Sequence, residues 1–266
     1  MLNKYGHVDD KIISEWVEQF HRDGYLFLPE FLTPETAERL KDDLDRELQS
    51  TQRTYTGADD INETMRLRVR LFENSPANLA LFDMDPMTAF AEAVIAPNCH
   101  VIHNNSFTTK HGGGITTWHQ DDASQYIVTH GERPTNVRLP VLFFTANYYL
   151  TDVTEIAHGG TEVIPGSHLF GGSPPKVIEG TPYESMVLPC LGKAGSVVLF
   201  NNQVWHRGGP NQSDRVRYIT QVTYARRIIS HMYYPFMNYQ MPEHVYKDAN
   251  PRLKRLLGFL DHGAYG

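Results

Sequence analysis

The chain has 266 residues, of which 41% are hydrophobic and 21% charged, so it can bury a sizeable core. A formal net charge of −7 and the absence of a Lys/Arg run argue against a nucleic-acid partner. Cys99 and Cys190 lie far apart in sequence, which indicates reduced thiols and neither a disulfide framework nor a zinc site. The sequence shows no signal-peptide core and no apolar run near the roughly 18 residues of a membrane span, so we expect a cytoplasmic protein without a membrane partner.

The first fifty residues predict two helices with a short strand between them. From Asp9 to Arg22 the apolar residues recur at three- and four-residue steps, which is typical of an amphipathic helix, and Gly24 suits its end. The apolar run Tyr25–Leu28 predicts a strand. Thr33-Pro34 combines a hydroxyl N-cap with proline at the first helical position, so a second helix should begin there and reach Gln49.

The stretch Arg66–Leu71 alternates with period two, which predicts a strand with a row of arginines on one face. A solvated edge strand is the simplest interpretation of this row, and anion binding in a cleft is the alternative. A further helix is predicted from Pro86 to Ile95.

Residues 100–224 are rich in β-branched and aromatic runs separated by Gly, Pro and Asn. The predicted strands are Val101–Lys110, Thr116–Gln120, Arg138–Leu150, Thr161–Ile164, Ser196–Phe200, Val204–His206 and Val216–Tyr224. Many short strands with turns between them favour an antiparallel sandwich or barrel. We therefore predict a mainly β fold with flanking α-helices in a single domain over residues 1–266. Its parts would be N-terminal helices at about 9–50, a barrel core at about 100–225 and an aromatic C-terminal segment at 226–266.

Three His-x-Asp patterns occur in the chain: His7-Val8-Asp9, His21-Arg22-Asp23 and His119-Gln120-Asp121. The first lies in an N-terminal stretch that we expect to fray. The second lies in the predicted first helix, where residues i and i+2 point about 200° apart and cannot reach one ion. The third lies at a predicted strand, where residues i and i+2 share a face. His119 and Asp121 are therefore the candidate metal ligands.

A second histidine, His206, suits the same metal because it follows a predicted strand and precedes Gly208-Gly209-Pro210. Two imidazoles and one carboxylate that leave coordination positions open are the arrangement of non-haem Fe(II) oxygenases. The sequence therefore predicts an iron site at His119, Asp121 and His206.

An arginine beside such an iron would hold the carboxylate of an organic co-substrate, because its guanidinium binds carboxylates through two hydrogen bonds. The predicted strand Val216–Tyr224 places four residues on one face: Arg217, Ile219, Gln221 and Thr223. Arg207 and Arg215 are also close in sequence, and spacing does not choose among the three arginines.

The chain resembles the phytanoyl-CoA dioxygenase-like family of Fe(II)- and 2-oxoglutarate-dependent oxygenases. The resemblance rests on Phe20–Tyr25, Trp118-His119-Gln120-Asp121, Gly159–His168, Gly195–Phe200 leading to Trp205-His206, and Asn211-x-Ser213-x-x-x-Arg217. It implies a double-stranded β-helix, which is a jelly-roll or cupin-like barrel. It also implies that His119, Asp121 and His206 bind iron and that Arg217 is the arginine that binds 2-oxoglutarate. By the same resemblance, three further residues contact 2-oxoglutarate: Thr161, Arg68 and Tyr148.

The reaction implied by the resemblance uses Fe(II), 2-oxoglutarate and O2, releases succinate and CO2, and hydroxylates an unactivated C–H bond of a small organic substrate such as a secondary metabolite. Relatives that halogenate have a small residue in place of the carboxylate, so Asp121 argues against halogenation. Desaturation, epimerisation or endoperoxide formation with the same cofactors is one alternative. Another is a metal hydrolase or isomerase without 2-oxoglutarate, and a third is a non-catalytic cupin-like binding protein.

Substrate recognition is predicted in the Asp122–Asn136 loop and in the aromatic segment around residues 231–242. Tyrosine and methionine side chains in such a segment would suit a partly apolar small molecule. Packing of the C-terminus onto the barrel explains the same composition. The sequence shows no basic cluster for the phosphates of coenzyme A, so an acyl-CoA substrate is not expected.

Overall fold

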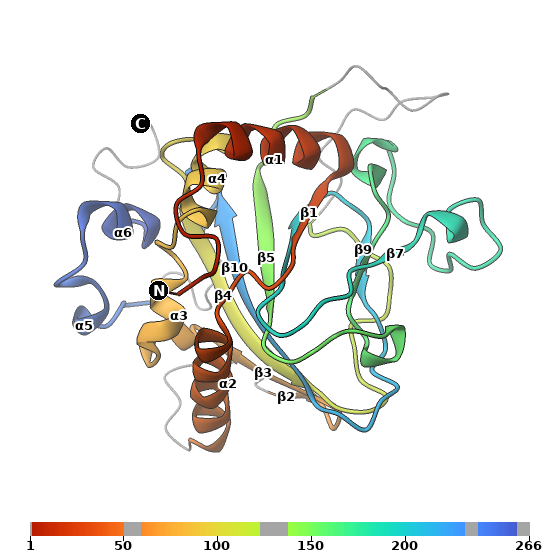
Figure 1. The fold of residues 1–266 in the computed structure, drawn as a ribbon, viewed down its shortest axis with the longest axis horizontal. Coiled ribbons are helices and arrows are strands. Elements are labelled where there is room, and N and C mark those ends of the chain that lie inside the picture. The colour runs from red at the N-terminus through yellow and green to blue at the C-terminus, as the bar shows by residue number, and fades with distance from the viewer. Residues whose placement is uncertain (1, 51–59, 123–137, 232–238, 260–266) are drawn as a thin grey trace.

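Two antiparallel sheets form the body of the protein (Figure 1). The structure is a computed structural model that describes residues 2–50, 60–122, 138–231 and 239–259. Within these ranges the larger sheet has the strand order β1-β8-β5-β10-β4-β3-β2 and the smaller sheet β7-β6-β9. The strands are β1 (Tyr25–Leu28), β2 (Asp60–Asn62), β3 (Met65–Val69), β4 (His100–Thr109), β5 (Phe143–Tyr149), β6 (Thr161–Val163), β7 (Leu188–Pro189), β8 (Val197–Asn201), β9 (His206–Gly208) and β10 (Arg217–Ala225). The predicted mainly β jelly-roll class is confirmed.

Helices lie on one side of the larger sheet and at its ends (Figure 1). They are α1 (Asp10–Asp23), α2 (Pro34–Gln49), α3 (Pro76–Ala80), α4 (Met87–Val94), α5 (Glu243–Tyr246) and α6 (Pro251–Leu256). The local signals work as expected: Asp9 caps α1, Gly24 ends it at φ 77°, and the Thr33 side chain caps α2. In the described part of the chain, no helix is both long and apolar enough to cross a membrane.

Several predicted elements differ from the structure. Residues Thr116–Gln120 do not form a strand, since only His119 makes a β-bridge there, to His206. The run Arg138–Leu150 contains a shorter strand, β5. Helices α3 and α5 and strand β2 were not predicted, because elements of three to five residues have too little periodicity to be read from sequence.

The arginine row of β3 is neither a solvated edge nor part of a cleft. Strand β3 is paired on both sides, with β2 and β4. Arg66 donates to the Leu48 carbonyl at 2.9 Å, and Arg68 donates to the carbonyls of Glu47 at 3.2 Å and Leu48 at 3.4 Å. These carbonyls belong to the last turn of α2, where the Glu47 carbonyl also accepts from the Ser50 N–H of the C-cap at 3.2 Å. The two arginines therefore hold α2 against the sheet.

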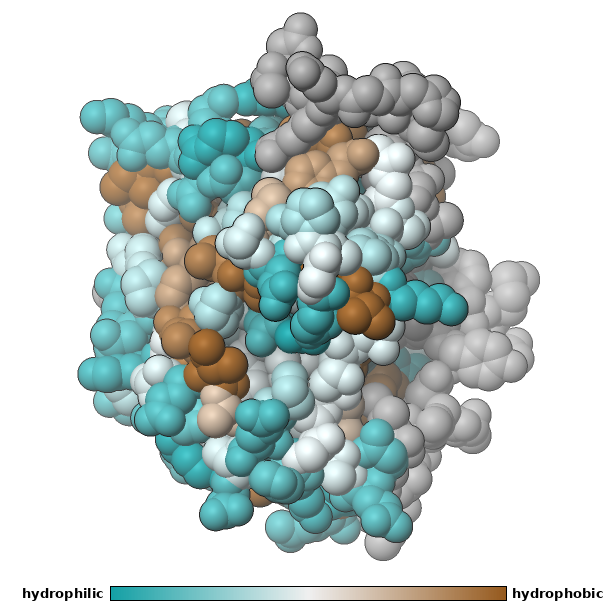
Figure 2. All heavy atoms as spheres, turned by 90° about the vertical axis from the view of Figure 1, so that its right-hand side faces the viewer, coloured by the Kyte–Doolittle hydropathy of each residue, from teal (hydrophilic) through white to brown (hydrophobic). Residues whose placement is uncertain are grey.

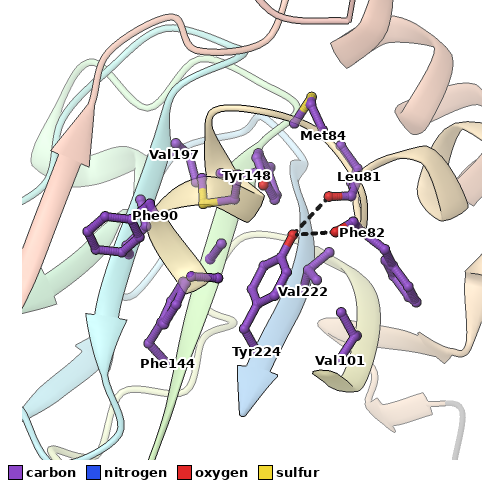
Figure 3. Packing of buried hydrophobic residues seen from close by; sticks show 14 of the residues in the cluster. Leu81, Phe82, Met84, Phe90, Val101, Phe144, Tyr148, Val197, Val222 and Tyr224 are labelled. Carbon is purple, nitrogen blue, oxygen red and sulfur yellow. Dashed lines mark hydrogen bonds between the residues drawn. The ribbon is translucent and has the colours of Figure 1, made fainter. Parts of the chain in front are cut away.

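One face of the larger sheet packs against the helices in an apolar core (Figure 3). Phe144 of β5 meets Phe20 of α1 and Phe90 of α4 edge to face, with ring centroids 5.6 and 5.4 Å apart. Tyr224 stacks on Phe144 and donates hydrogen bonds to the Leu81 and Phe82 carbonyls. Because successive strand residues point to opposite faces, the neighbours of these core residues project to the other side, between the two sheets.

Candidate functional site

A cavity of about 440 Å³ lies between the two sheets. Its walls come from β4, β5 and β10 of the larger sheet, from β6 and β9 of the smaller sheet, and from the segment around His119. The volume is within the usual range of small-molecule sites, roughly 300–1,000 Å³. Arg217, Ile219, Gln221 and Thr223 all line it, as their alternation along β10 predicts.

Three side chains in the cavity meet closely enough to bind one metal ion: His119, Asp121 and His206. The Asp121 Oδ1 atom lies 4.0 Å from His119 Nε2 and 3.7 Å from His206 Nε2. Two ligands that each lie about 2.1 Å from an ion are at most about 4.2 Å apart, so both separations are compatible with a shared ion. No other group of three potential ligands occurs among the described residues, and neither of the two other His-x-Asp patterns contributes one.

The backbone orients both imidazoles toward this point. His119 Nδ1 lies 2.8 Å from the Thr117 carbonyl, and His206 Nδ1 lies 2.9 Å from the Val204 carbonyl. A carbonyl only accepts, so each Nδ1 carries the proton and each Nε2 keeps a free lone pair toward Asp121. The two residues are also joined by reciprocal backbone hydrogen bonds of 3.0 and 2.9 Å. The single β-bridge between them therefore provides the alignment that a full strand was expected to provide.

The surroundings keep His206 neutral. Burial lowers its pKa, Asp121 opposes this effect, and His119 adds to it. The Phe200 ring packs against the His206 ring with centroids 4.3 Å apart. A neutral imidazole is the form that binds a metal, so burial favours the ligating state.

Arg217 lines the cavity and is 4% exposed. Its guanidinium donates to the Gly209 carbonyl and to Thr109 Oγ1, both at 3.2 Å, while its buried Nε has no hydrogen-bond partner among the described residues. Burial lowers the pKa of Arg217 to about 10, so the group is still charged at neutral pH. A buried cation with donor capacity to spare and no carboxylate partner in the described structure is suited to an anionic ligand.

Gly159 leaves room for the Arg217 guanidinium because it has no Cβ atom. A Cβ atom on Gly159 would lie 2.8 Å from Arg217 Nη1 and 2.6 Å from the Gly209 carbonyl, and its φ of +70° favours glycine as well. Two residues later, Thr161 lines the cavity. Its backbone N–H donates to the Tyr149 hydroxyl at 2.9 Å, and its Oγ1 accepts from Asn147 Nδ2 at 3.3 Å.

The Asn211-x-Ser213 motif determines how β10 begins. The Asn211 side chain is fully buried, and its amide donates to the Thr109 and Arg215 carbonyls at 2.9 and 2.7 Å. Its Oδ1 accepts from the Ser213 hydroxyl and backbone N–H. This closed turn ties the loop to the end of β4 and delivers Arg217 into the cavity at the first position of β10.

The other two candidate arginines are placed differently. Arg215 is exposed. Arg207 reaches the cavity wall, but its Nε donates to Glu162 at 2.6 Å and its guanidinium lies over the Trp118 ring. Its charge is therefore already paired.

A family profile described as phytanoyl-CoA dioxygenase (PhyH) matches residues 20–219. The chain belongs to this family. Its members depend on Fe(II) and 2-oxoglutarate, and the chain is accordingly a non-haem dioxygenase. The match spans the site from α1 through Arg217 and ends at residue 219, so it includes His119, Asp121, His206 and Arg217 and leaves most of β10 outside.

Similar curated proteins are fungal dioxygenases. Dioxygenase trt7 of Aspergillus terreus is 22% identical over 258 residues, which cover 91% of this chain and 82% of that protein. Dioxygenase andF of Emericella variicolor is 28% identical over 142 residues, which cover 53% of this chain and 45% of that protein.

Solved structures of similar fold include HygX from Streptomyces hygroscopicus with nickel and 2-oxoglutarate bound. It has a TM-score of 0.64 at 16% identity, with 85% of this chain and 90% of that chain covered. The non-heme alpha ketoglutarate dependent epimerase SnoN from nogalamycin biosynthesis has a TM-score of 0.59 at 20% identity, with 82% and 84% covered. At these identities the likeness supports the fold.

Two residues expected to contact 2-oxoglutarate are not brought to the cavity. Tyr148 is fully buried in the core on the opposite face of β5, beside Phe31 (Figure 3). Its neighbour Tyr149 projects from the other face of β5 into a second buried cluster, where its hydroxyl accepts from the Thr161 N–H and donates to the Cys190 carbonyl at 3.0 Å. Arg68 is bound to the end of α2, as described above. The structure therefore does not place either side chain in the cavity, because resemblance aligned a segment without fixing which face each side chain takes.

Sequence reasoning missed Asn147 and His103, which the structure places in the cavity lining. Asn147 Oδ1 accepts from Gln221 Nε2 at 2.6 Å, and Asn147 Nδ2 donates to Thr161 Oγ1 at 3.3 Å. His103 of β4 also lines the cavity, and burial lowers its pKa to about 4 against the opposing effect of Asp121. Period-two alternation on β4 and β5 could have identified these residues once the cavity-facing set of β10 was known.

The predicted substrate segments fall mostly outside the described residues. Of the Asp122–Asn136 loop only Asp122 is described, and it lines the cavity. Of residues 231–242 the structure describes His231 and 239–242. On the side of the molecule that carries the smaller sheet, hydrophobic residues lie in small groups among hydrophilic ones (Figure 2). We therefore assign the functional site to the cavity that contains the buried Arg217 and the cluster of His119, Asp121 and His206.

Proposed function

We propose that the protein hydroxylates an unactivated C–H bond of a small organic molecule at an iron bound by His119, Asp121 and His206, with 2-oxoglutarate as co-substrate. The observation that carries this proposal is the joint presence, in one cavity, of the three potential ligands and the buried Arg217 without a carboxylate partner. The HygX structure has nickel and 2-oxoglutarate bound, which is consistent with these cofactors.

The charges of the site fit the cofactors. With Asp121 as the one anionic ligand, a bound divalent ion keeps a net single positive charge, and Arg217 adds a second. The two carboxylates of 2-oxoglutarate neutralise both. A co-substrate that spans the ion and Arg217 therefore removes the cost of burying this guanidinium without a partner.

When bound, iron and 2-oxoglutarate supply the oxidising chemistry, with release of succinate and CO2. The residues of the chain bind and orient. The Thr117 and Val204 carbonyls hold the imidazoles in the ligating tautomer, and Asn147 directs its amide to Thr161 so that the threonine proton is free for a carboxylate. Phe200 shields His206 from water.

The test is anaerobic addition of Fe(II) and 2-oxoglutarate, which should produce a weak visible metal-to-ligand charge-transfer band. His119→Ala should abolish the band. The matched control is His7→Ala, which alters the exposed histidine of another His-x-Asp pattern and should leave the band unchanged. A wild-type protein without the band, or a His119→Ala variant that retains it, would contradict the iron assignment.

SnoN is an epimerase, so the outcome of the reaction in this chain requires product analysis. Oxygen-dependent succinate release with a hydroxylated product supports the proposal. A desaturated or epimerised product would keep the cofactors and correct the reaction type. Turnover without succinate would instead favour a hydrolase or isomerase, and absence of turnover with a broad set of substrates would favour a binding protein.

A further inference from the structure

The residues on the cavity-side face of the larger sheet form rows, because β10 lies between β4 and β5 in antiparallel register, with a register shift against β4 between Thr223 and Tyr224. Arg217 and Thr109 form the first row. The next rows along β10 are Phe107–Ile219–Tyr149, Asn105–Gln221–Asn147, His103–Thr223–Thr145 and, last, Ala225 with Phe143. The chemistry of this wall thus changes in steps from cationic through apolar and amide-bearing to a row of one histidine and two threonines.

The His103–Thr223–Thr145 row lies at the level of the candidate iron ligands. Thr145 is directly opposite Phe200 on β8, and the Phe200 ring packs on His206. On the other side of the row, His103 lines the same cavity as Asp121. A co-substrate that reaches from Arg217 to the iron would lie along the rows before this one. The His103 row therefore borders the space that remains for the substrate.

Resting on the proposed function, we infer that His103, together with the Thr145–Thr223 hydroxyl pair, positions the substrate by hydrogen bonding to a neutral oxygen, a carbonyl or hydroxyl, on an otherwise apolar molecule. His103 is thus a positioning and specificity-determining residue. The substrate class that follows is an uncharged, mostly hydrocarbon compound with an oxygen close to the carbon that reacts.

The hydrogen-bonding capacity of the row supports this inference. Thr145 Oγ1 and Thr223 Oγ1 lie 2.9 Å apart, so one hydroxyl donates to the other and the second proton remains for another acceptor. A neutral imidazole has one donor and one acceptor, of which one is directed at the Asn105 side chain and the other remains for a ligand. Both His103 and the threonines line the cavity.

The surroundings of the row are apolar. Ile102, Phe143 and Ala225 form a buried cluster next to it, and Ile229 packs against that cluster. Ile102, Phe143 and Ile229 also line the cavity. A hydrocarbon ligand that packs against these side chains is stabilised because its apolar surface leaves water. The polar groups of the row would lose their hydrogen bonds to water when such a ligand binds, unless the ligand carries an oxygen that replaces them.

Charge argues against an anionic substrate in this half of the cavity. Arg217 lies three rows away, and Arg207 is paired with Glu162. The acidic groups Asp121 and Asp122 face the same space. Among the described residues that line this half of the cavity, none therefore offers a carboxylate or phosphate an unpaired guanidinium or ammonium group, and Arg226 and Arg227, which follow β10, are not part of the lining.

The test measures binding, not turnover. The probes are three compounds with the same bicyclic frame. 1-Tetralone carries a neutral carbonyl oxygen, tetralin carries no oxygen, and tetralin-1-carboxylate carries an anionic carboxylate. Dissociation constants are measured by ligand-observed NMR on protein loaded with Zn(II) and 2-oxoglutarate. We expect wild-type protein to bind 1-tetralone at least about fivefold more tightly than the other two, as one or two hydrogen bonds allow.

His103→Leu should abolish the advantage of 1-tetralone over tetralin, and His103→Gln, which can donate and accept, should retain most of it. His7→Leu is the matched control and should change nothing. The charge-transfer band with Fe(II) and 2-oxoglutarate should persist in both His103 variants, which shows that the metal site is intact.

The inference is wrong if wild-type protein binds none of the probes, prefers tetralin-1-carboxylate, or binds tetralin as well as 1-tetralone. Retention of the ketone preference in His103→Leu would also overturn it. Loss of the charge-transfer band in that variant would instead assign His103 to support of the metal site and remove its substrate role. Absence of the band in wild-type protein would contradict the proposed function itself, so the two failures are distinguishable.

Discussion

The two faces of the larger sheet carry different kinds of side chain on the same strands. On the helix-covered face, β5 contributes Phe144, Ala146 and Tyr148 to a closed apolar core. On the cavity face, the same strand contributes Thr145 and Asn147, and β10 adds a buried guanidinium with spare donors. One face is stabilised by complementary packing, whereas the other carries polar groups that can bind a ligand. Substitutions on the first face should act on folding, and those on the second face on ligand binding.

Neighbouring phenylalanines provide the sharpest test of this difference. Phe144→Ala should lower the free energy of unfolding by about 3–5 kcal/mol, because the ring is fully buried among Phe20, Phe90 and Tyr224. Phe143→Ala should cost roughly half as much, since its ring already borders the cavity and its removal creates less new void. Urea denaturation of both variants measures the difference. Equal losses would mean that the cavity face is packed as tightly as the core face.

On the cavity face, Asp121→Ala should weaken Fe(II) binding by more than about a hundredfold, because it removes the one anionic ligand candidate. Its effect on the unfolding of metal-free protein should be within about 0.5 kcal/mol, as for a partly exposed side chain outside any core. Iron titration and thermal unfolding of the metal-free protein check the two halves of this prediction. A large loss of stability with intact iron binding would assign Asp121 to the fold.

Arg217→Gln should weaken 2-oxoglutarate binding by about 10- to 100-fold, as expected when a charge-assisted hydrogen bond is removed. Iron affinity should not change, and the ligand-free protein should be no less stable, because burial without a carboxylate partner disfavours the arginine. Arg215→Gln, at an exposed position of the same segment, is the matched control. If Arg217→Gln unfolds the protein while binding is retained, Arg217 has a structural role.

The smallest effects concern the adjacent tyrosines of β5. The Tyr148 hydroxyl has no hydrogen-bond partner among the described residues, so Tyr148→Phe should leave stability unchanged or raise it by up to about 1 kcal/mol. Tyr149→Phe removes the hydroxyl that joins Thr161 to Cys190, and it should cost about 1–3 kcal/mol. Tyr149→Phe should also weaken 2-oxoglutarate binding, which Tyr148→Phe should not. The reverse result would restore Tyr148 as a cofactor contact.

Local chemistry in the sequence was sufficient for the first two helices and the strand between them. Asp9, Gly24 and Thr33 act as caps within a few residues of the groups that they satisfy, so no distant contact is needed to predict them. Period two along β10 likewise identified which of its side chains share a face. The order of His119, Asp121, His206 and Arg217 in the chain, together with the family resemblance, pointed to the residues that the structure brings into one cavity.

Tertiary structure decided the rest. Tyr148 and Tyr149 are consecutive and chemically alike, and only the packing of β5 between helices and cavity determines which one reaches Thr161. Arg68 looked available for an anion, but carbonyls in the last turn of α2 are its partners, and they are 20 and 21 residues away in sequence. His103 carried no motif, and its place opposite Thr223 in the cavity follows from the register of β4 against β10. In each case a side chain takes its role from partners that only the folded chain supplies.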